Sequence, residues 1–233
     1  LLMLMECPFQ YSLRRVYSIY PQVGDELGYG RSLHEIIQRS IENGHWKSKD
    51  EIVKIVDEHT FIPLEGSRQL QVHKDSIKNQ VLALSRIDEL AQINENEIPI
   101  RFYIGSVEIT GIIDSYTENM AQEITLIDWK TSIHDSLLPR YKKQMLLYAY
   151  ALDRQKIKLA GASLIDVKQT AQSGSIASIP IDLSEEHLNY IERQVKNEIQ
   201  RLKSLEFDAY PSQETCTSCD VKDICQYRWE RDA

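Results

Sequence analysis

Apolar side chains recur every three or four residues through the first half of the chain. The clearest run consists of Leu33, Ile36, Ile37 and Ile41. It stops at Asn43-Gly44, a typical C-terminal cap signal, and so predicts a helix over residues 29–43. Weaker patterns with the same period cover residues 49–58 and 67–92. The first half is therefore expected to be mostly helical.

The pattern then changes to a period of two, which is typical of strands. Residues 98–104 and 107–113 alternate on either side of Gly105-Ser106, so they predict a hairpin. Residues 123–129 predict a third strand, because β-branched residues are frequent there.

Helix and strand patterns alternate in the rest of the chain. A helix is expected after Pro139, with strands over residues 160–167 and 176–181, and a long amphipathic helix from Ser184 to about residue 205. The buried side of the helix after Pro139 is expected to carry Met145, Leu146, Tyr148, Ala149 and Leu152. With no internal repeat and no linker in the sequence, one α/β domain with a short tail is expected.

Composition limits the classes of protein that remain. The 233 residues are 42% hydrophobic and 27% charged, which favours a globular protein with a core and excludes disordered and collagen-like chains. The longest apolar runs, residues 1–5 and 145–152, are far shorter than the roughly 20 residues of a membrane span. The net charge of −8 predicts no bulk attraction to a polyanion. Since the chain starts at Leu1 without a secretory signal, we expect it to be a fragment of a longer chain.

The most informative stretch lies in the predicted strands. Asp128 and Lys130 point to one face of their strand, and Asp114 ends the preceding strand, so pairing would bring the two carboxylates together. Such oxygen ligands suit Mg²⁺ or Mn²⁺, and Lys130 could then orient a nucleophile or stabilise the transition state of phosphodiester hydrolysis. The alternative is a surface ion pair worth roughly 0–1 kcal/mol.

Three further features fit a phosphate-cleaving site. Gln144 and Tyr148 lie on one helix face and can both hydrogen-bond a phosphate or a base edge. His34 sits beside an apolar helix stripe, where a packing role is the alternative to a ligand role. A basic strip surrounds Gln144, with an ordinary solvated helix face as its alternative. The strip consists of Arg140, Lys142, Lys143, Arg154, Lys156 and Lys158.

The four cysteines are placed at the two ends of the chain. Cys7 stands alone, whereas Cys216, Cys219 and Cys225 form C-x2-C-x5-C. A disulfide framework belongs to small secreted chains, so we expect a reduced, cytoplasmic setting in which the three tail thiols bind a metal. Zinc and iron–sulfur clusters usually take four ligands, and Cys7 is the other cysteine available.

Together these residues resemble a known family. Gly30-Arg31-Ser32-Leu33-His34, Gly111-Ile112-Ile113-Asp114, Asp128-Trp129-Lys130-Thr131 and Gln144-x3-Tyr148 are similar to the ordered motifs of the RecB-type branch of the PD-(D/E)xK nucleases. Cys7-Pro8 together with the tail cysteines resembles the iron–sulfur variant of that branch, found in AddB-type subunits, CRISPR-associated exonucleases and nuclease domains fused to UvrD-like helicases. The Ser-x-Ser segment that usually precedes the Cys-Pro pair is absent.

The resemblance implies a fold, a function and a set of site residues. The fold is α/β: a restriction-endonuclease-like core with a mixed central sheet flanked by helices, a helical N-terminal part and a cysteine-bearing tail. The function is a metal-dependent DNA nuclease, expected to act as an exonuclease on single-stranded ends. The metal is Mg²⁺ or Mn²⁺, bound by His34, Asp114, Asp128 and the carbonyl of Trp129, with Lys130 as the catalytic lysine and Gln144 and Tyr148 at the substrate phosphate.

The resemblance also implies a cofactor and partners. Cys7, Cys216, Cys219 and Cys225 would hold a [4Fe–4S] cluster, and Arg140, Lys142 and Lys143 would contact DNA. A helicase is a possible partner in repair, recombination or defence, and no membrane is expected. The expected domain comprises an N-terminal cysteine segment (1–28), a core (29–205) with a helical insertion at about 45–95, and a tail (206–233). Two alternatives remain, namely a catalytically weak DNA-binding scaffold and a zinc-ribbon interaction module.

Overall fold

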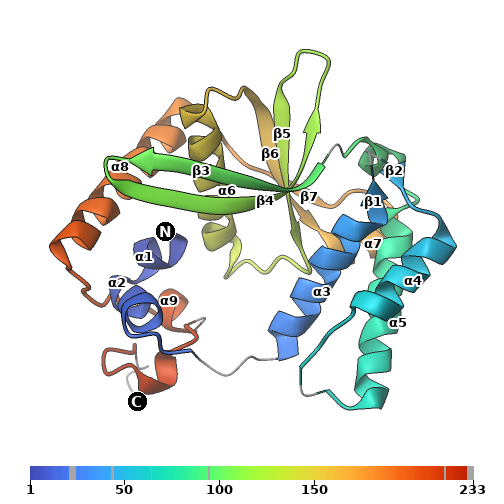
Figure 1. The fold of residues 1–233 in the computed structure, drawn as a ribbon, viewed down its shortest axis with the longest axis horizontal. Coiled ribbons are helices and arrows are strands. Elements are labelled where there is room, and N and C mark those ends of the chain that lie inside the picture. The colour runs from blue at the N-terminus through green and yellow to red at the C-terminus, as the bar shows by residue number, and fades with distance from the viewer. Residues whose placement is uncertain (21–24, 43–44, 64, 94, 218, 230–233) are drawn as a thin grey trace. The chain divides into compact units, whose positions relative to one another are not determined.

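A five-stranded mixed sheet forms the centre of the fold in the computed structural model, which describes residues 1–20, 25–42, 45–63, 65–93, 95–217 and 219–229 (Figure 1). The strand order is β3-β4-β5-β6-β7, with β4/β5 antiparallel, β5/β6 parallel and β6/β7 antiparallel. The strands are β3 (Glu95–Ile104), β4 (Val107–Glu118), β5 (Ile124–Lys130), β6 (Leu159–Asp166) and β7 (Ser178–Pro180). This arrangement confirms the expected α/β class with a mixed central sheet.

The chain groups into two compact units, each described by itself. The larger unit contains residues 23–102 and 110–184, and hence most of the sheet. The smaller unit contains residues 1–22, 103–109 and 185–233. The hairpin tip between β3 and β4 thus belongs to the smaller unit, and its turn uses Gly105 at a φ of +60°, where a side chain would be strained.

A three-helix layer builds the core of the larger unit. Helices α3 (Asp25–Ser40), α4 (Lys49–His59) and α5 (Ser67–Leu84) lie beside one another (Figure 1). Their apolar stripes meet the inward-facing residues Ile127 and Trp129 of β5 in one hydrophobic cluster. Since side chains alternate along a strand, the other face of β5 is left for Asp128 and Lys130, as the sequence predicted.

Two helix predictions in this layer were partly wrong. The first helix ends at Ser40, because Ile41–Glu42 (β1) pairs with His45–Trp46 (β2); the cap signal at 43–44 lies outside the described residues. The segment 67–92 is not one helix: α5 stops at Leu84, and a separate 3-10 helix covers Asp88–Gln92.

Helix α3 is fixed in place by a close backbone approach. A Cβ at Gly28 would lie 2.7 Å from Pro63 Cδ, so only glycine allows this contact. One turn later, Ser32 Oγ donates to the Phe61 carbonyl and accepts from the Phe61 N–H, both at 3.0 Å. These contacts set the position of His34, two residues further along the helix.

The second half of the larger unit follows the predicted order with three differences. Helix α6 (Leu138–Arg154) and β6 match the expected elements, but β4 continues to Glu118, so Asp114 lies within the strand rather than at its end. The last strand covers only Ser178–Pro180 because the backbone of Ala177 bonds back to Asp166 and Thr170. A helix that the sequence pattern did not predict, α7 (Val167–Ser173), is capped by Asp166.

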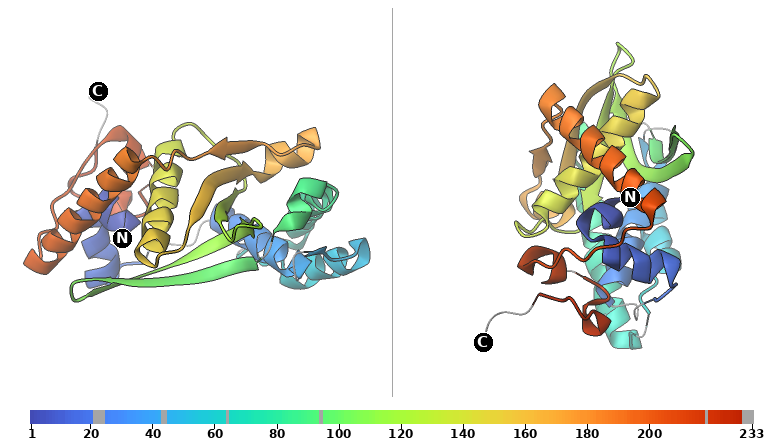
Figure 2. Two further views of the ribbon diagram at one scale, coloured as in Figure 1. Left: turned by 90° about the horizontal axis from the view of Figure 1, so that it is seen from above. Right: turned by 90° about the vertical axis from the view of Figure 1, so that its left-hand side faces the viewer.

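The smaller unit consists of helices from both ends of the chain. It contains α1 (Leu2–Glu6), α2 (Pro8–Tyr11), a π-helix (Ser12–Val16), the long α8 (Glu185–Ser204), α9 (Gln213–Thr217) and a 3-10 helix (Lys222–Ile224). Helix α8 confirms the predicted amphipathic helix. In Figure 2, the N-terminal helices (blue) and the C-terminal segment (red) lie side by side, and Gln10 Nε2 donates to Asp220 Oδ1 at 2.8 Å. No helix among the described residues has the length and apolar character needed to cross a membrane.

Candidate active site

The sheet brings Asp114 and Asp128 together. The antiparallel register of β4 and β5 pairs Ser115 with Ile127, so Asp114 and Asp128 occupy the neighbouring positions. Asp114 Oδ2 accepts a hydrogen bond from the Trp129 backbone N–H at 3.1 Å, and the Trp129 indole donates to Ser115 Oγ at 3.0 Å. These bonds fix the Asp114 carboxylate against β5.

Asp128 and Lys130 form a buried ion pair. Lys130 Nζ lies 2.6 Å from Asp128 Oδ2, and the Asp128 side chain is 2% exposed. The alternative of a solvated surface pair is therefore wrong. Burial raises the pKa of Asp128 to about 6, helped by the charge of Asp114 and opposed by that of Lys130. A carboxylate in this position is expensive to bury unless cations face it.

The Lys130 ammonium contacts three side chains, namely Asp128, Gln144 and Tyr141. Lys130 Nζ donates to Gln144 Oε1 at 3.2 Å and lies 4.5 Å from the centre of the Tyr141 ring. Gln144 Nε2 in turn donates to the Tyr148 hydroxyl at 2.9 Å. Gln144 and Tyr148 thus lie on one helix face, as their spacing predicted, and Gln144 contacts Lys130. Burial raises the pKa of Tyr148 to about 12, so its hydroxyl keeps its proton.

His34 completes the group of side chains. Its Nδ1 lies 3.3 Å from Asp114 Oδ2. Burial by itself would lower the pKa of His34, but the hydrogen bond to Asp114 and the charges of Asp114 and Asp128 raise it overall. His34 is therefore part of this polar site, although it also neighbours the apolar stripe of α3.

The donor chemistry of these residues fits a divalent cation. Both carboxylate oxygens of Asp128 are buried: Oδ2 faces Lys130 Nζ, whereas Oδ1 has no hydrogen-bond partner among the described residues. Asp114 and His34 add an oxygen and a nitrogen beside them. Among the residues that the structure describes, however, no group of three or more His, Cys, Asp or Glu side chains is arranged to enclose a metal ion. The ammonium of Lys130 supplies a positive charge beside the buried carboxylate of Asp128.

Two hollows meet at His34. One, of about 1090 Å³, is lined by Gly30, Arg31, His34, Glu35, Gln38, Arg39, Ile41, Glu42, Lys47, Ile55 and His59. The other, of about 780 Å³, is lined by Tyr29, His34, Glu65, His73, Ser76, Gln80, Lys130, Thr131, Ser132, His134, Leu137, Tyr141 and Lys168. A chain-like substrate passing His34 can therefore occupy space on either side of it.

The three residues of the basic strip that were expected to contact DNA lie at different positions around α6. Arg140 lies one turn before Gln144 and so shares its face. Lys142 is two residues from Gln144, about 160° around the helix, and is exposed to solvent. Lys143 is half-buried at an intermediate position. Of these three DNA contacts expected from the sequence, Arg140 has the position closest to the site.

The four cysteines line one small hollow in the smaller unit. Cys7, Cys216, Cys219 and Cys225 all contribute to its wall, and its volume is about 20 Å³, about one water molecule. Burial, with the charges of Asp220, Cys7 and Cys225, raises the pKa of the Cys219 thiol to about 11. The fold therefore brings Cys7 to the same hollow as the three tail cysteines, although the described thiols are not arranged to enclose a metal ion.

Sequence reasoning missed two contributors to the site. Tyr141 contacts Lys130, and its signal was its position three residues before Gln144 on the same helix. Asp166 binds the loop after β5 by accepting from the Ile133 N–H at 2.8 Å. No short-range pattern could have revealed this second contact, because 33 residues separate its partners.

A mixed sheet flanked by helices, with two aspartates and a lysine on paired strands, defines a restriction-endonuclease-like α/β protein. The family model of the PD-(D/E)XK nuclease superfamily matches residues 2–226, and the chain belongs to this superfamily. Its members are generally nucleases, typically dependent on Mg²⁺ or Mn²⁺.

Solved structures and curated proteins were compared as well. The crystal structure of SSO0001 is 18% identical, with a TM-score of 0.43 over 88% of this chain and 97% of that one. Protein VC1899 from Vibrio cholerae is 14% identical, with a TM-score of 0.26; the match covers 88% of this chain and 55% of VC1899. No curated protein matches the chain.

Proposed function

We propose that the chain is a divalent-metal-dependent deoxyribonuclease that hydrolyses phosphodiester bonds, with single-stranded DNA ends as its substrate. The observation that carries this proposal is the buried Asp128–Lys130 pair beside Asp114 on the neighbouring strand. Asp128 Oδ1 is buried without a hydrogen-bond partner among the described residues, which is costly for stability, so a role in binding a cation accounts for its presence.

Asp114, Asp128 and His34, together with the Trp129 carbonyl, are the residues that would hold Mg²⁺ or Mn²⁺. A bound divalent ion supplies a water of lowered pKa and offsets charge that develops on a phosphate. The sheet register and the Trp129 N–H bond fix the ligands on β4 and β5, and the contacts of Ser32 with Phe61 fix His34 on α3. The ligand positions are thus set by backbone geometry rather than by flexible loops.

Lys130 is the proposed catalytic lysine. Its ammonium carries a positive charge and three donors, and Gln144 and Tyr141 keep it beside Asp128. A phosphate bound there receives a hydrogen bond from Nζ, and the charge at Nζ stabilises the additional negative charge of the transition state. The Tyr148 hydroxyl positions Gln144, which leaves Lys130 little freedom to move away.

The cysteine hollow supports a further part of the proposal. We assign Cys7, Cys216, Cys219 and Cys225 to a [4Fe–4S] cluster that joins the two ends of the chain, as in the iron–sulfur branch of the RecB-type nucleases. All four thiols line one hollow of the smaller unit. This branch also includes nucleases joined to helicases, so a helicase domain or subunit is the proposed partner.

Cleavage of a labelled single-stranded oligonucleotide with Mg²⁺ or Mn²⁺ tests the function. We expect wild-type protein to degrade it and a chelator to stop the reaction. Lys130→Ala and Asp114→Ala should each lower kcat at least about 100-fold, because the first removes the positive charge at the reacting phosphate and the second removes a proposed metal ligand.

Lys142→Ala is the matched control for Lys130→Ala, since it removes a lysine from the exposed side of α6 and should leave kcat nearly unchanged. Equal cleavage by Lys130→Ala, Asp114→Ala and wild type would contradict the site assignment. DNA binding without any cleavage by wild type would instead favour the scaffold function.

A further inference from the structure

We propose that the 780 Å³ hollow beside Lys130 is a subsite for one unpaired nucleotide, whose base enters the hollow while its phosphate stays at Lys130. This inference rests on the proposed nuclease function, because it names the substrate geometry at the same site. A preference for single-stranded DNA would then come from recognition of an unstacked base and not from the backbone alone.

The size and position of the hollow fit one nucleotide. Its volume lies within the range of about 300–1,000 Å³ of small-molecule sites, which does not accommodate a double helix. Lys130 and His34 both line it, so a phosphate beside them lies at its edge. A base can enter only after it leaves its pairing partner, and this is least costly in a single strand.

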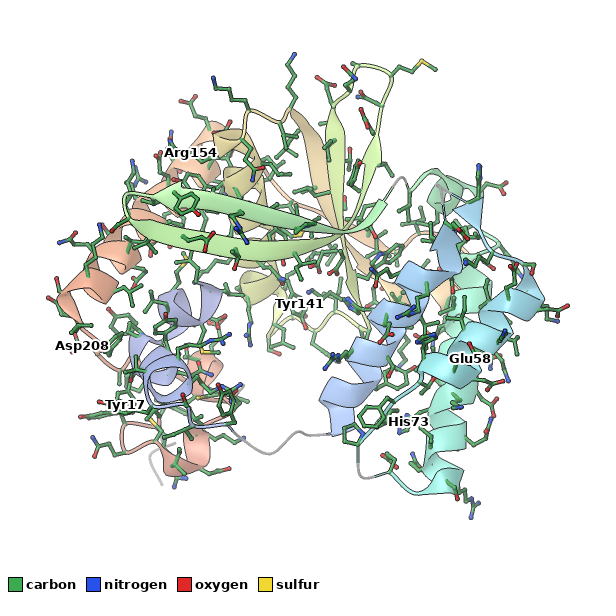
Figure 3. All side chains as sticks on the ribbon, viewed as in Figure 1. Tyr17, Glu58, His73, Tyr141, Arg154 and Asp208 are labelled. Carbon is green, nitrogen blue, oxygen red and sulfur yellow. The ribbon has the colours of Figure 1, made fainter. Side chains whose placement is uncertain are left out.

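The wall offers aromatic surfaces for a base. Tyr29 from α3 and Tyr141 from α6 both line the hollow, and His73 from α5 packs edge-on against Tyr29 with ring centres 5.4 Å apart. Tyr141 and His73 are labelled in Figure 3. Stacking on such rings accepts any base, because every base has a π face.

Tyr29, Ser76 and Gln80 form a hydrogen-bonded network in the wall of the hollow. The Tyr29 hydroxyl and Ser76 Oγ lie 2.9 Å apart, and Gln80 Nε2 donates to both, at 2.8 and 3.1 Å. These bonds hold the groups in one arrangement before a ligand arrives, which lowers the entropy cost of binding. The hydroxyls keep further capacity to donate or accept at a base edge.

The charges at the hollow favour a nucleotide as well. Lys130 and Lys168 line it, and the carboxylate of Glu65 lies 3.5 Å from His73 Nε2. Lys168 lies in the first turn of α7 and is exposed, so it can contact the phosphate on the other side of the bound nucleotide. Two lysines around an aromatic hollow match the charge and chemistry of a nucleotide in a polynucleotide chain.

The test measures binding without cleavage. Fluorescence anisotropy in excess chelator compares a labelled thymidine 12-mer with an all-abasic 12-mer of the same length and with a 12-base-pair duplex. Wild-type protein should bind the thymidine 12-mer at least about tenfold more tightly than the other two, since each stacked base contributes severalfold to affinity. Equal affinity for the thymidine and abasic probes, or no binding of either, would overturn the proposal.

Substitutions in the wall of the hollow test whether these residues cause the difference in affinity between the thymidine and abasic probes. Tyr29→Leu should bring the ratio of the two affinities close to one, and Lys168→Ala should weaken binding of both probes alike. Because Tyr29 also packs against the core, Gln80→Leu serves as a second variant that loosens the polar network. Lys54→Ala, at an exposed position of α4 outside the hollow, should leave the ratio and both affinities unchanged. An unchanged ratio in folded Tyr29→Leu and Gln80→Leu proteins would assign the discrimination to another surface.

Cleavage assays separate this inference from the function on which it rests. Metal-dependent cleavage of the abasic and thymidine strands at equal rates and affinities would leave the nuclease function standing and remove the subsite. Base-dependent binding by a protein that never cleaves would support the subsite and contradict the nuclease function.

Discussion

Lys130 shows how one residue depends on its neighbours. Its ammonium faces a buried carboxylate at 2.6 Å, an amide oxygen at 3.2 Å and an aromatic ring at 4.5 Å. Together these contacts hold Nζ in one location. The reactivity of the site is therefore set by residues of α6 as much as by the strand that carries the lysine.

Tyr141 should act as a positioning residue for Lys130. Tyr141→Phe keeps the ring and should retain near wild-type kcat, whereas Tyr141→Leu should lower kcat about tenfold, the size of a partly buried cation–π contact. Steady-state kinetics on a single-stranded oligonucleotide measures both variants. Similar losses for Phe and Leu would assign the role to the hydroxyl instead.

The two sides of α6 should differ in their contribution to DNA binding. Arg140→Glu, on the Gln144 face, should weaken binding and reduce the salt slope by about one, because one phosphate contact is lost. Lys142→Glu makes the same change of charge on the exposed side and should affect the slope less. Affinity measured from 50 to 200 mM salt separates them, and equal effects would make the strip a diffuse electrostatic surface.

At the scale of elements, Asp166 connects three parts of the larger unit. It ends β6, caps α7 by accepting from the Gln169 N–H at 2.8 Å, and binds the Ile133 N–H in the loop that follows β5. This loop begins directly after Lys130. The edge of the hollow is thus positioned by a carboxylate on the neighbouring parallel strand.

Asp166→Ala should destabilise the protein by about 2 kcal/mol, since it removes a helix cap and leaves a second backbone N–H without its partner. Asp166→Asn keeps one acceptor oxygen and should cost about half as much. Urea denaturation followed by circular dichroism measures both changes. Equal stability of wild type and Asp166→Ala would show that water replaces both bonds at no cost.

At the scale of the whole molecule, the ends of the chain are joined within the smaller unit. Asp220 accepts from Gln10 and forms an ion pair with Arg14 at 3.2 Å, next to Cys219. Cys7, Cys219 and Cys225 line the same hollow. A metal centre there would close a loop of more than two hundred residues, and closure cost rises only about 0.6 kcal/mol for each doubling of loop length.

Cys7→Ser should therefore lose the same cofactor as Cys219→Ser, and both should expose the C-terminal tail. Iron and zinc content, visible absorption and limited proteolysis of protein purified without oxygen provide the measurements. Thr217→Ser, in the same tail, should keep full metal content and a protected tail. Full iron occupancy in Cys7→Ser would exclude Cys7 as a ligand, and zinc in place of iron would exclude the cluster.

The sequence by itself determined the main elements and which residues to propose for the site, apart from Tyr141 and Asp166. Periodicity located α4, α6, β5 and α8 closely because each has a clear apolar face. The alternation along β5 placed Asp128 and Lys130 on one face, and the helical spacing placed Gln144 with Tyr148. These are short-range properties of the backbone, which the local pattern records directly.

Tertiary structure decided what depends on residues far apart in the chain. The end of α3 at Ser40 follows from the pairing of β1 with β2, and the α7 helix depends on Asp166, whose other oxygen binds the distant loop after β5. The burial of Asp128, the contact of Tyr141 with Lys130 and the hollow formed by α3, α5 and α6 likewise require packed elements. A local pattern cannot contain them, because burial and long-range contacts arise only when the sheet and helices close around the site.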